Sequence, residues 1–183
     1  SRETCLLCDV GGETTPNSLS LLNIEPIPRL HLIKYMGYFL EAFICAQNEA
    51  EVFSGRYRSA TIVNLDQGLT LIPFTVELFN EIITSSSSEH VGTFELLTEN
   101  IEDEILTTIV NGRIAYIEAA YHGGEGGQSG IIWEQNKRVT QLEYGQTRIN
   151  EVLQYFGVVS NNGEDEFASL RLGRYRSTQE WTE

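Results

Sequence analysis

The sequence predicts an α+β fold, with a single domain, a mainly antiparallel sheet and several short helices. The first supporting observation is the length of 183 residues, which is about the size of one domain. The second is that strand-like runs alternate with short stretches of helical periodicity, and no linker divides them. The third is a glycine-rich hairpin between two long strand-like runs, which indicates antiparallel pairing.

The N-terminal part differs in composition from the rest of the chain. Residues 11–18 are rich in glycine, threonine and other turn-forming residues, and Pro26 and Pro28 interrupt regular structure soon afterwards. We therefore interpret residues 1–33 as a flexible or loosely packed arm and residues 34–183 as the single α+β domain.

The remaining elements follow from local patterns. Apolar, aromatic or β-branched runs predict strands at residues 38–45, 60–65, 69–73 and 138–143, besides the hairpin over residues 115–134. Apolar spacing and capping signals predict helices at residues 48–53, 75–83, 100–110, 147–156 and 164–170. The predicted N-caps are Asn48, Thr75 and Asn100, and Gly157 is placed to end a helix.

The charge balance excludes some classes of partner. Twelve basic residues against 26 acidic residues give a formal net charge of −14. Such a surface repels polyanions, so we expect no nucleic-acid binding. No apolar run approaches the roughly 20 residues that span a membrane, and residues 1–9 do not resemble a signal peptide. We therefore expect a soluble cytoplasmic protein that does not bind membranes.

Acidic residues are concentrated between Arg58 and Arg113. This span contains nine acidic residues and no basic one. It is interpreted either as a solvated face, which favours solubility, or as a docking surface for a basic protein. The candidate binding residues are Glu102, Asp103 and Glu104, in the first turn of the helix predicted at residues 100–110.

The hairpin tip carries four glycines among the five residues 123–127. This density requires either positive φ angles or a close approach of the backbone to another group. A phosphate-binding loop would open a helix, whereas a strand follows here and Glu125 would oppose a phosphate. Glu118 and His122 share one strand face, as an acid–base pair or simply an exposed sheet face would. The candidate binding residues at the hairpin are Glu118, His122, Gly123, Gly124, Glu125 and Gln128.

The patterns of cysteine, histidine and arginine residues do not predict a catalytic or metal site. Cys5 and Cys8 form a C-x-x-C pair, but a structural zinc site needs four ligands, and Cys45 and the three histidines lack ligand spacing. No nucleophile stands in a recognisable elbow. We therefore predict no catalytic residue, metal or cofactor. The C-terminal arginines are interpreted as partners of nearby carboxylates or, alternatively, as a site for an anionic ligand, and Trp181 is expected to dock on the domain. These arginines are Arg171, Arg174 and Arg176, and the carboxylates are Glu164, Asp165 and Glu166.

Two motifs carry a resemblance to a protein family. The run from Tyr116 to Gln128 has the pattern Tyr-Ile-Glu-Ala-x-x-x-Gly-Gly-x-Gly-x-Gln, and the run from Leu172 to Thr178 has the pattern Leu-Gly-Arg-x-Arg-Ser-Thr. Over about residues 37–181 the chain resembles a family of small bacterial proteins with no established activity. The resemblance implies an aromatic residue at position 122, which disfavours catalysis by His122. Some members resemble immunity proteins of toxin systems in size, acidity and lack of catalytic motifs.

These patterns favour a non-enzymatic soluble bacterial binding protein of immunity or regulatory type, which engages a basic protein partner such as a toxin. The alternative is a small-molecule-binding protein or hydrolase-like enzyme with its site at the hairpin. That alternative predicts a concave pocket containing Glu118, His122 and the glycine loop. A third hypothesis is a structural subunit of a larger assembly; the sequence leaves the oligomeric state open.

Overall fold

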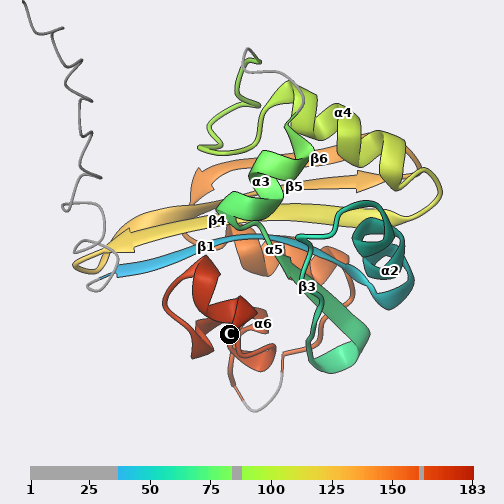
Figure 1. The fold of residues 1–183 in the computed structure, drawn as a ribbon. Coiled ribbons are helices and arrows are strands. Elements are labelled where there is room, and N and C mark those ends of the chain that lie inside the picture. The colour runs from blue at the N-terminus through green and yellow to red at the C-terminus, as the bar shows by residue number, and fades with distance from the viewer. Residues whose placement is uncertain (1–36, 84–87, 161–162) are drawn as a thin grey trace, which may run out of the picture.

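The computed structural model describes residues 37–83, 88–160 and 163–183. They form an antiparallel sheet with short helices on both faces (Figure 1). The predicted α+β fold class is therefore confirmed. The arm predicted at residues 1–33 lies outside the described residues, together with Cys5 and Cys8.

The sheet has six strands in the order β2-β3-β1-β4-β5-β6. Their bounds are β1 (Gly37–Ala46), β2 (Val63–Asn64), β3 (Leu69–Pro73), β4 (Arg113–His122), β5 (Glu125–Glu134) and β6 (Lys137–Gly145). All neighbouring strands pair antiparallel. The strand predicted at residues 60–65 is shorter than expected, because only Val63 and Asn64 pair with β3.

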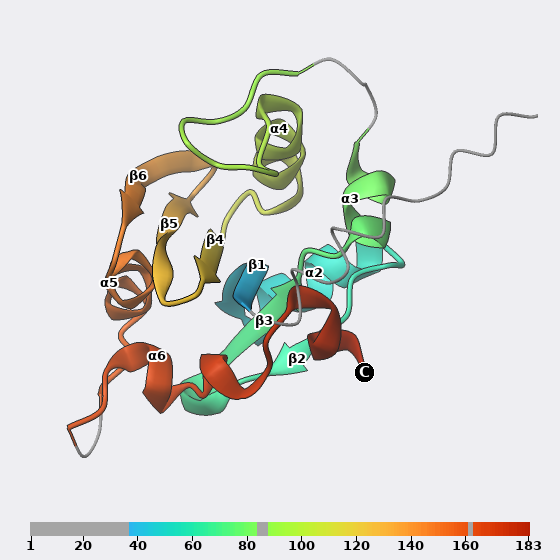
Figure 2. The ribbon, with the colours of Figure 1, turned by 90° about the vertical axis from the view of Figure 1, so that its left-hand side faces the viewer.

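Helices cover both faces of the sheet (Figures 1 and 2). One face carries α2 (Gln47–Arg56), α3 (Val76–Ile82) and α4 (Glu99–Thr108). The other face carries α5 (Arg148–Tyr155), α6 (Glu166–Ser169), and the 3-10 turns η2 (Leu172–Arg174) and η3 (Thr178–Thr182). The 3-10 turn η1 (Asp66–Gly68) joins β2 to β3. Within the described ranges, no helix has the length and apolar character needed to cross a membrane.

Strand alternation divides the apolar side chains into two cores. Phe43, Tyr116 and Trp133 point toward α2, α3 and α4, and all three are buried. Leu40 and Ile132 point to the opposite face, where they pack with residues of α5 and the C-terminal turns. Because successive side chains of a strand point to opposite faces, long apolar runs in the central strands serve both cores at once.

The glycine cluster is explained by backbone geometry. Gly123 and Gly124 form the two-residue turn between β4 and β5, with φ angles of 62° and 87°. Positive φ at both central residues is what a type I′ hairpin turn requires. At Gly126 a Cβ atom would lie 2.0 Å from the carbonyl oxygen of Ala120, so no side chain fits there. The two expected reasons for glycine, positive φ and close approach, are both confirmed.

Helix ends agree only in part with the predicted caps. Thr75 caps α3, since its hydroxyl accepts a hydrogen bond from the backbone N–H of Leu78 at 3.3 Å. Gly157 follows α5 with a φ angle of 81°, as predicted for a helix end. The prediction for Asn100 was wrong, because α4 begins one residue earlier and the Asn100 N–H binds the Ser88 hydroxyl. Asn48 was also wrong as a cap, because it lies inside α2.

The C-terminal segment packs onto the sheet. Trp181 is buried, as expected, and the guanidinium of Arg174 lies 4.3 Å from the centre of its ring. The expected local pairing of Arg171 was wrong. Its Nε atom lies 3.7 Å from a carboxylate oxygen of Asp66, because Arg171 has a left-handed backbone and the chain folds back toward η1.

Candidate functional site

Glu118, the first hairpin candidate, lies beneath the loop between α3 and α4. Its carboxylate accepts hydrogen bonds from the backbone N–H groups of Glu95 at 2.8 Å and Leu96 at 2.9 Å. The hydroxyl of Tyr116 donates a third hydrogen bond at 2.8 Å. Glu118 is only 9% exposed. Its carboxylate therefore holds this loop against the sheet and does not face an open site.

The hairpin tip lies apart from Glu118. His122 and Glu125 pair across the end of β4 and β5, and both are exposed together with Gly123 and Gly124. His122 lies four positions after Glu118 along the extended strand, a distance of roughly 13 Å between their backbones. The cavity beside Glu118 has a volume of about 50 Å³, and His122 does not line it. The structure therefore does not bring the predicted acid–base pair together.

Gln128 supports a helix. Its side-chain oxygen accepts a hydrogen bond from the backbone N–H of Ile149 at 2.9 Å. Ile149 lies in the first turn of α5, where backbone N–H groups have no partner within the helix. Gln128 thus connects β5 to the start of α5.

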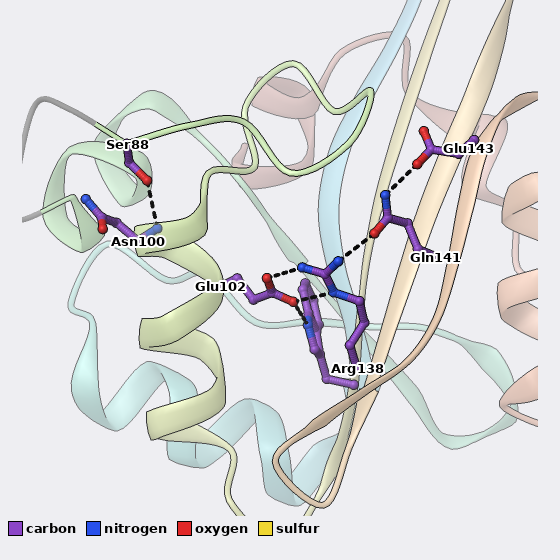
Figure 3. Close-up of polar contacts among 7 residues, drawn as sticks. Ser88, Asn100, Glu102, Arg138, Gln141 and Glu143 are labelled. Atoms are coloured by element: carbon purple, nitrogen blue, oxygen red, sulfur yellow. Dashed lines mark hydrogen bonds and ion pairs between the residues drawn. The ribbon is translucent and has the colours of Figure 1, made fainter.

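Glu102, the first acidic candidate on α4, is buried in a polar network (Figure 3). It accepts a hydrogen bond from the indole N–H of Trp133 at 2.6 Å and one from Nε of Arg138 at 2.8 Å. A second guanidinium nitrogen of Arg138 pairs with the other carboxylate oxygen. Burial alone would raise the pKa of Glu102, but these donors hold the pKa below its ordinary value. Glu102 therefore joins α4 to β5 and β6.

The two neighbours of Glu102 differ from each other. Glu104 forms an ion pair with Arg56 at 2.5 Å and accepts a hydrogen bond from Tyr57, which joins α4 to α2. Asp103 is exposed, and its carboxylate forms no ion pair with any described residue. Only Asp103 of the three acidic candidates is directed to solvent.

Further exposed carboxylates lie on α3, on α4 and on the loop between them, which cover the same face of the sheet as Asp103. We call this set the acidic face: Glu77, Glu89, Glu95, Glu99 and Asp103. None of the five is in an ion pair with a described residue. The arginines nearest α4 are Arg56 and Arg138, and both are already paired with α4 carboxylates. No described basic residue forms an ion pair with the acidic face, and only Glu99 has an electrostatic interaction with one of these arginines, Arg138.

Other chemistry has little support among the described residues. Cys45 is buried, and burial raises the pKa of its thiol to about 12, so it remains protonated at neutral pH. No group of three or more histidine, cysteine, aspartate or glutamate residues within residues 37–83, 88–160 and 163–183 is arranged to hold a metal ion.

An apolar groove lies beside the acidic face, and no sequence pattern predicted it. It has a volume of about 480 Å³, and its lining includes Phe39, Phe79 and Glu95. These residues come from β1, α3 and the loop before α4, so no local pattern could have connected them. The only available signal was that aromatic residues recur on both sides of β3.

Comparison with known proteins adds no assignment. The chain matches no protein-family model, and it has no significant match among curated proteins or solved structures.

Proposed function

We propose that this protein is a non-enzymatic binding protein that engages a basic protein partner through the acidic face. The observation that carries the proposal is the set of five exposed carboxylates on one side of the sheet without an ion pair to the described residues. An immunity or regulatory protein that neutralises a basic toxin would be one instance of this function.

The physical reason is electrostatic. Unpaired carboxylates on one face attract a partner of opposite charge and increase its rate of encounter. The formal net charge of −14 acts in the same direction at longer range. Salt screens such exposed charges, so binding of this kind weakens as ionic strength rises.

A hairpin site has weaker support. Glu118 already accepts three hydrogen bonds, and its carboxylate is far from His122 along β4. The glycines of the tip are accounted for by turn geometry and close approach. The acidic face is therefore the better candidate.

The test uses the immobilised full chain and a series of peptides of equal length that differ only in their content of lysine and arginine. We expect binding to increase with basic content and to weaken with added salt. The double variant Glu99→Lys with Asp103→Lys should weaken binding by about tenfold, corresponding to about 1.4 kcal/mol.

The matched control is Glu125→Lys with Glu164→Lys, which changes the net charge equally at exposed positions away from the acidic face. It should preserve most of the binding. Equal losses in the two double variants would show that overall charge alone attracts the peptides. Absence of binding, or binding insensitive to salt, would overturn the proposed function.

A further inference from the structure

The apolar groove lies beside the acidic face. It is lined by residues of β1, of α3 and the residues just before it, of the loop before α4, and of the 3-10 turn η3. Its volume of about 480 Å³ falls within the roughly 300–1,000 Å³ typical of ligand sites. The apolar part of the lining consists of Phe39, Phe74, Val76, Phe79 and Leu96. Val76 is 66% exposed, so it is accessible to a ligand at the groove.

The groove exists because β3 is shorter than its neighbour β1. The pairing of β1 with β3 ends at Ala42 and Pro73, and the chain then turns away into α3. The C-terminal segment runs along the uncovered edge of β1 instead, where the carbonyl oxygen of Arg176 accepts a hydrogen bond from the N–H of Phe39 at 2.9 Å. Space therefore remains between α3 and this segment.

Two walls of the groove are fixed by hydrogen bonds. The hydroxyl of Thr178 donates to the carboxylate of Glu41 and accepts from the Glu41 backbone N–H at 2.8 Å. On the opposite side, Glu118 holds Glu95 and Leu96 by their backbone N–H groups. The groove is thus built into the fold by contacts that join distant parts of the sequence.

The charge of the groove is negative. Glu41 and Glu95 line it, and none of the described residues in its lining is basic. Glu95 is exposed, and its carboxylate forms no ion pair with the described residues. Glu95 also belongs to the acidic face, so groove and face form a continuous surface. An anionic ligand is disfavoured here, whereas a cation with an apolar stem fits both components of the lining.

We propose that this groove is the anchoring site for an arginine side chain of the basic partner, with the guanidinium next to Glu95 and its stem against Phe39 and Phe79. This inference rests on the proposed function and specifies which residue of the partner is recognised. Arginine fits better than lysine, because its planar guanidinium can form two parallel hydrogen bonds with a carboxylate and is only weakly hydrated. Lysine concentrates its charge in a strongly hydrated ammonium group.

The test uses methyl-labelled full-chain protein and two short peptides that are identical except that one carries arginine and the other citrulline, its neutral analogue. Val76 and Leu96 supply methyl signals at the groove, and Val139, an exposed residue on β6, supplies a control signal. We expect the arginine peptide to shift the Val76 and Leu96 signals saturably, with Val139 unaffected. The citrulline peptide should bind at least tenfold more weakly.

The variant Glu95→Gln keeps the shape of the side chain and removes its charge. It should reduce the preference for arginine over citrulline to less than about threefold. The matched variant Glu89→Gln removes a charge of the acidic face that does not line the groove, and it should retain the preference. Unchanged preference in Glu95→Gln would overturn the arginine site.

Failure of this inference is distinguishable from failure of the proposed function. If basic peptides bind and respond to Glu99→Lys with Asp103→Lys, but leave the Val76 and Leu96 methyl signals unshifted, the acidic face stands and the groove assignment is overturned. If no basic peptide binds, the proposed function and this inference are both overturned.

Arg29 and Lys34 precede β1 in the sequence, so the chain's own N-terminal residues are the alternative occupant that a further variant tests. Substituting both by glutamine in the full chain tests this possibility. We expect the Val76 and Leu96 methyl signals to remain in place when no peptide is added. A shift of these signals would assign the groove to the protein's own N-terminal residues and overturn the proposal.

Discussion

The hydroxyl of Tyr116 donates a 2.8 Å hydrogen bond to Glu118, two residues further along β4. Both side chains point toward the α3–α4 side of the sheet, and Tyr116 is completely buried. Burial raises the pKa of Tyr116 well above its ordinary value, so the phenol remains a neutral donor. Together with the backbone N–H groups of Glu95 and Leu96, it gives the Glu118 carboxylate three donors.

Replacing Glu118 should therefore destabilise the fold. Glu118→Gln keeps one acceptor oxygen but turns an amide N–H₂ toward a backbone donor. We expect a loss of about 1–3 kcal/mol in the free energy of unfolding, measured by chemical denaturation. The amide protons of Glu95 and Leu96 should also exchange faster. Glu125→Gln, at the exposed hairpin tip, should stay within about 0.5 kcal/mol of the parent protein. Similar losses in both variants would contradict the structural role of Glu118.

The network around Glu102 predicts a pH dependence of stability. Burial opposes its ionisation, but hydrogen bonds from Arg138 and Trp133 lower the pKa of Glu102 below the ordinary value of 4.5. A lowered pKa in the folded state gives stability that is present above the unfolded value and is lost as the pH falls through the folded value. The stability difference between the parent protein and Glu102→Gln should therefore shrink as the pH falls below the ordinary value of 4.5 and through the lower folded-state pKa of Glu102.

Thermal unfolding at several pH values measures this difference. Glu125→Gln serves as the control, because Glu125 is exposed and its carboxylate makes no hydrogen bond within the described part of the chain. Its stability should follow that of the parent protein throughout. If the difference in stability between the parent protein and Glu102→Gln does not change with pH, ionisation of Glu102 does not stabilise the fold.

The elements were predictable because their signals are local. The turn between β4 and β5 needs two residues with positive φ, and the adjacent glycines Gly123 and Gly124 predict such a turn from the sequence. The helix α5 has Ile149, Val152 and Leu153 on one face, and all three are buried. Such apolar periodicity predicts a helix reliably, because it determines which face of the helix packs against the core.

The polar contacts were not predictable, since they depend on segments distant in sequence. Glu102 and Glu104 were interpreted as surface acids, yet Arg138 and Arg56 reach them from β6 and α2. Asn100 was predicted to cap α4, but its backbone N–H instead donates a hydrogen bond to the hydroxyl of Ser88. The groove depends on the early end of β3 and on Thr178 far along the chain. Tertiary pairing decides each of these, and no local pattern encodes it.

Close packing between β5 and α5 predicts an intolerant glycine. A Cβ atom at Gly130 would lie 2.6 Å from a methyl group of Val152, which is completely buried. Gly130→Ala should therefore destabilise the protein by about 1–3 kcal/mol through overpacking. Gly55→Ala is the matched control, since a Cβ atom there meets nothing within 4 Å and Gly55 lies in α2. It should stabilise the protein by about 0.5–1 kcal/mol. Urea denaturation of both variants checks these opposite signs.

The two tryptophans differ in how their indole N–H groups are satisfied, and this predicts different costs for their replacement. Trp133 donates to Glu102 at 2.6 Å, whereas the buried N–H of Trp181 has no hydrogen-bond partner among the described residues. Trp133→Phe removes a donor from a buried carboxylate, which should cost about 1–3 kcal/mol besides the lost packing. Trp181→Phe removes an unpaired polar group, which offsets part of its lost packing, so it should cost less.

The protein has only two tryptophans, so each variant retains a single fluorescent reporter of its unfolding. Urea midpoints measured by this fluorescence should be lower for Trp133→Phe than for Trp181→Phe. Far-ultraviolet circular dichroism provides a second probe. It reports the secondary structure of the whole chain, whereas the remaining tryptophan reports only its own surroundings. An equal or larger loss in Trp181→Phe would mean that its N–H group is paired in solution, for which an ordered water is the simplest partner.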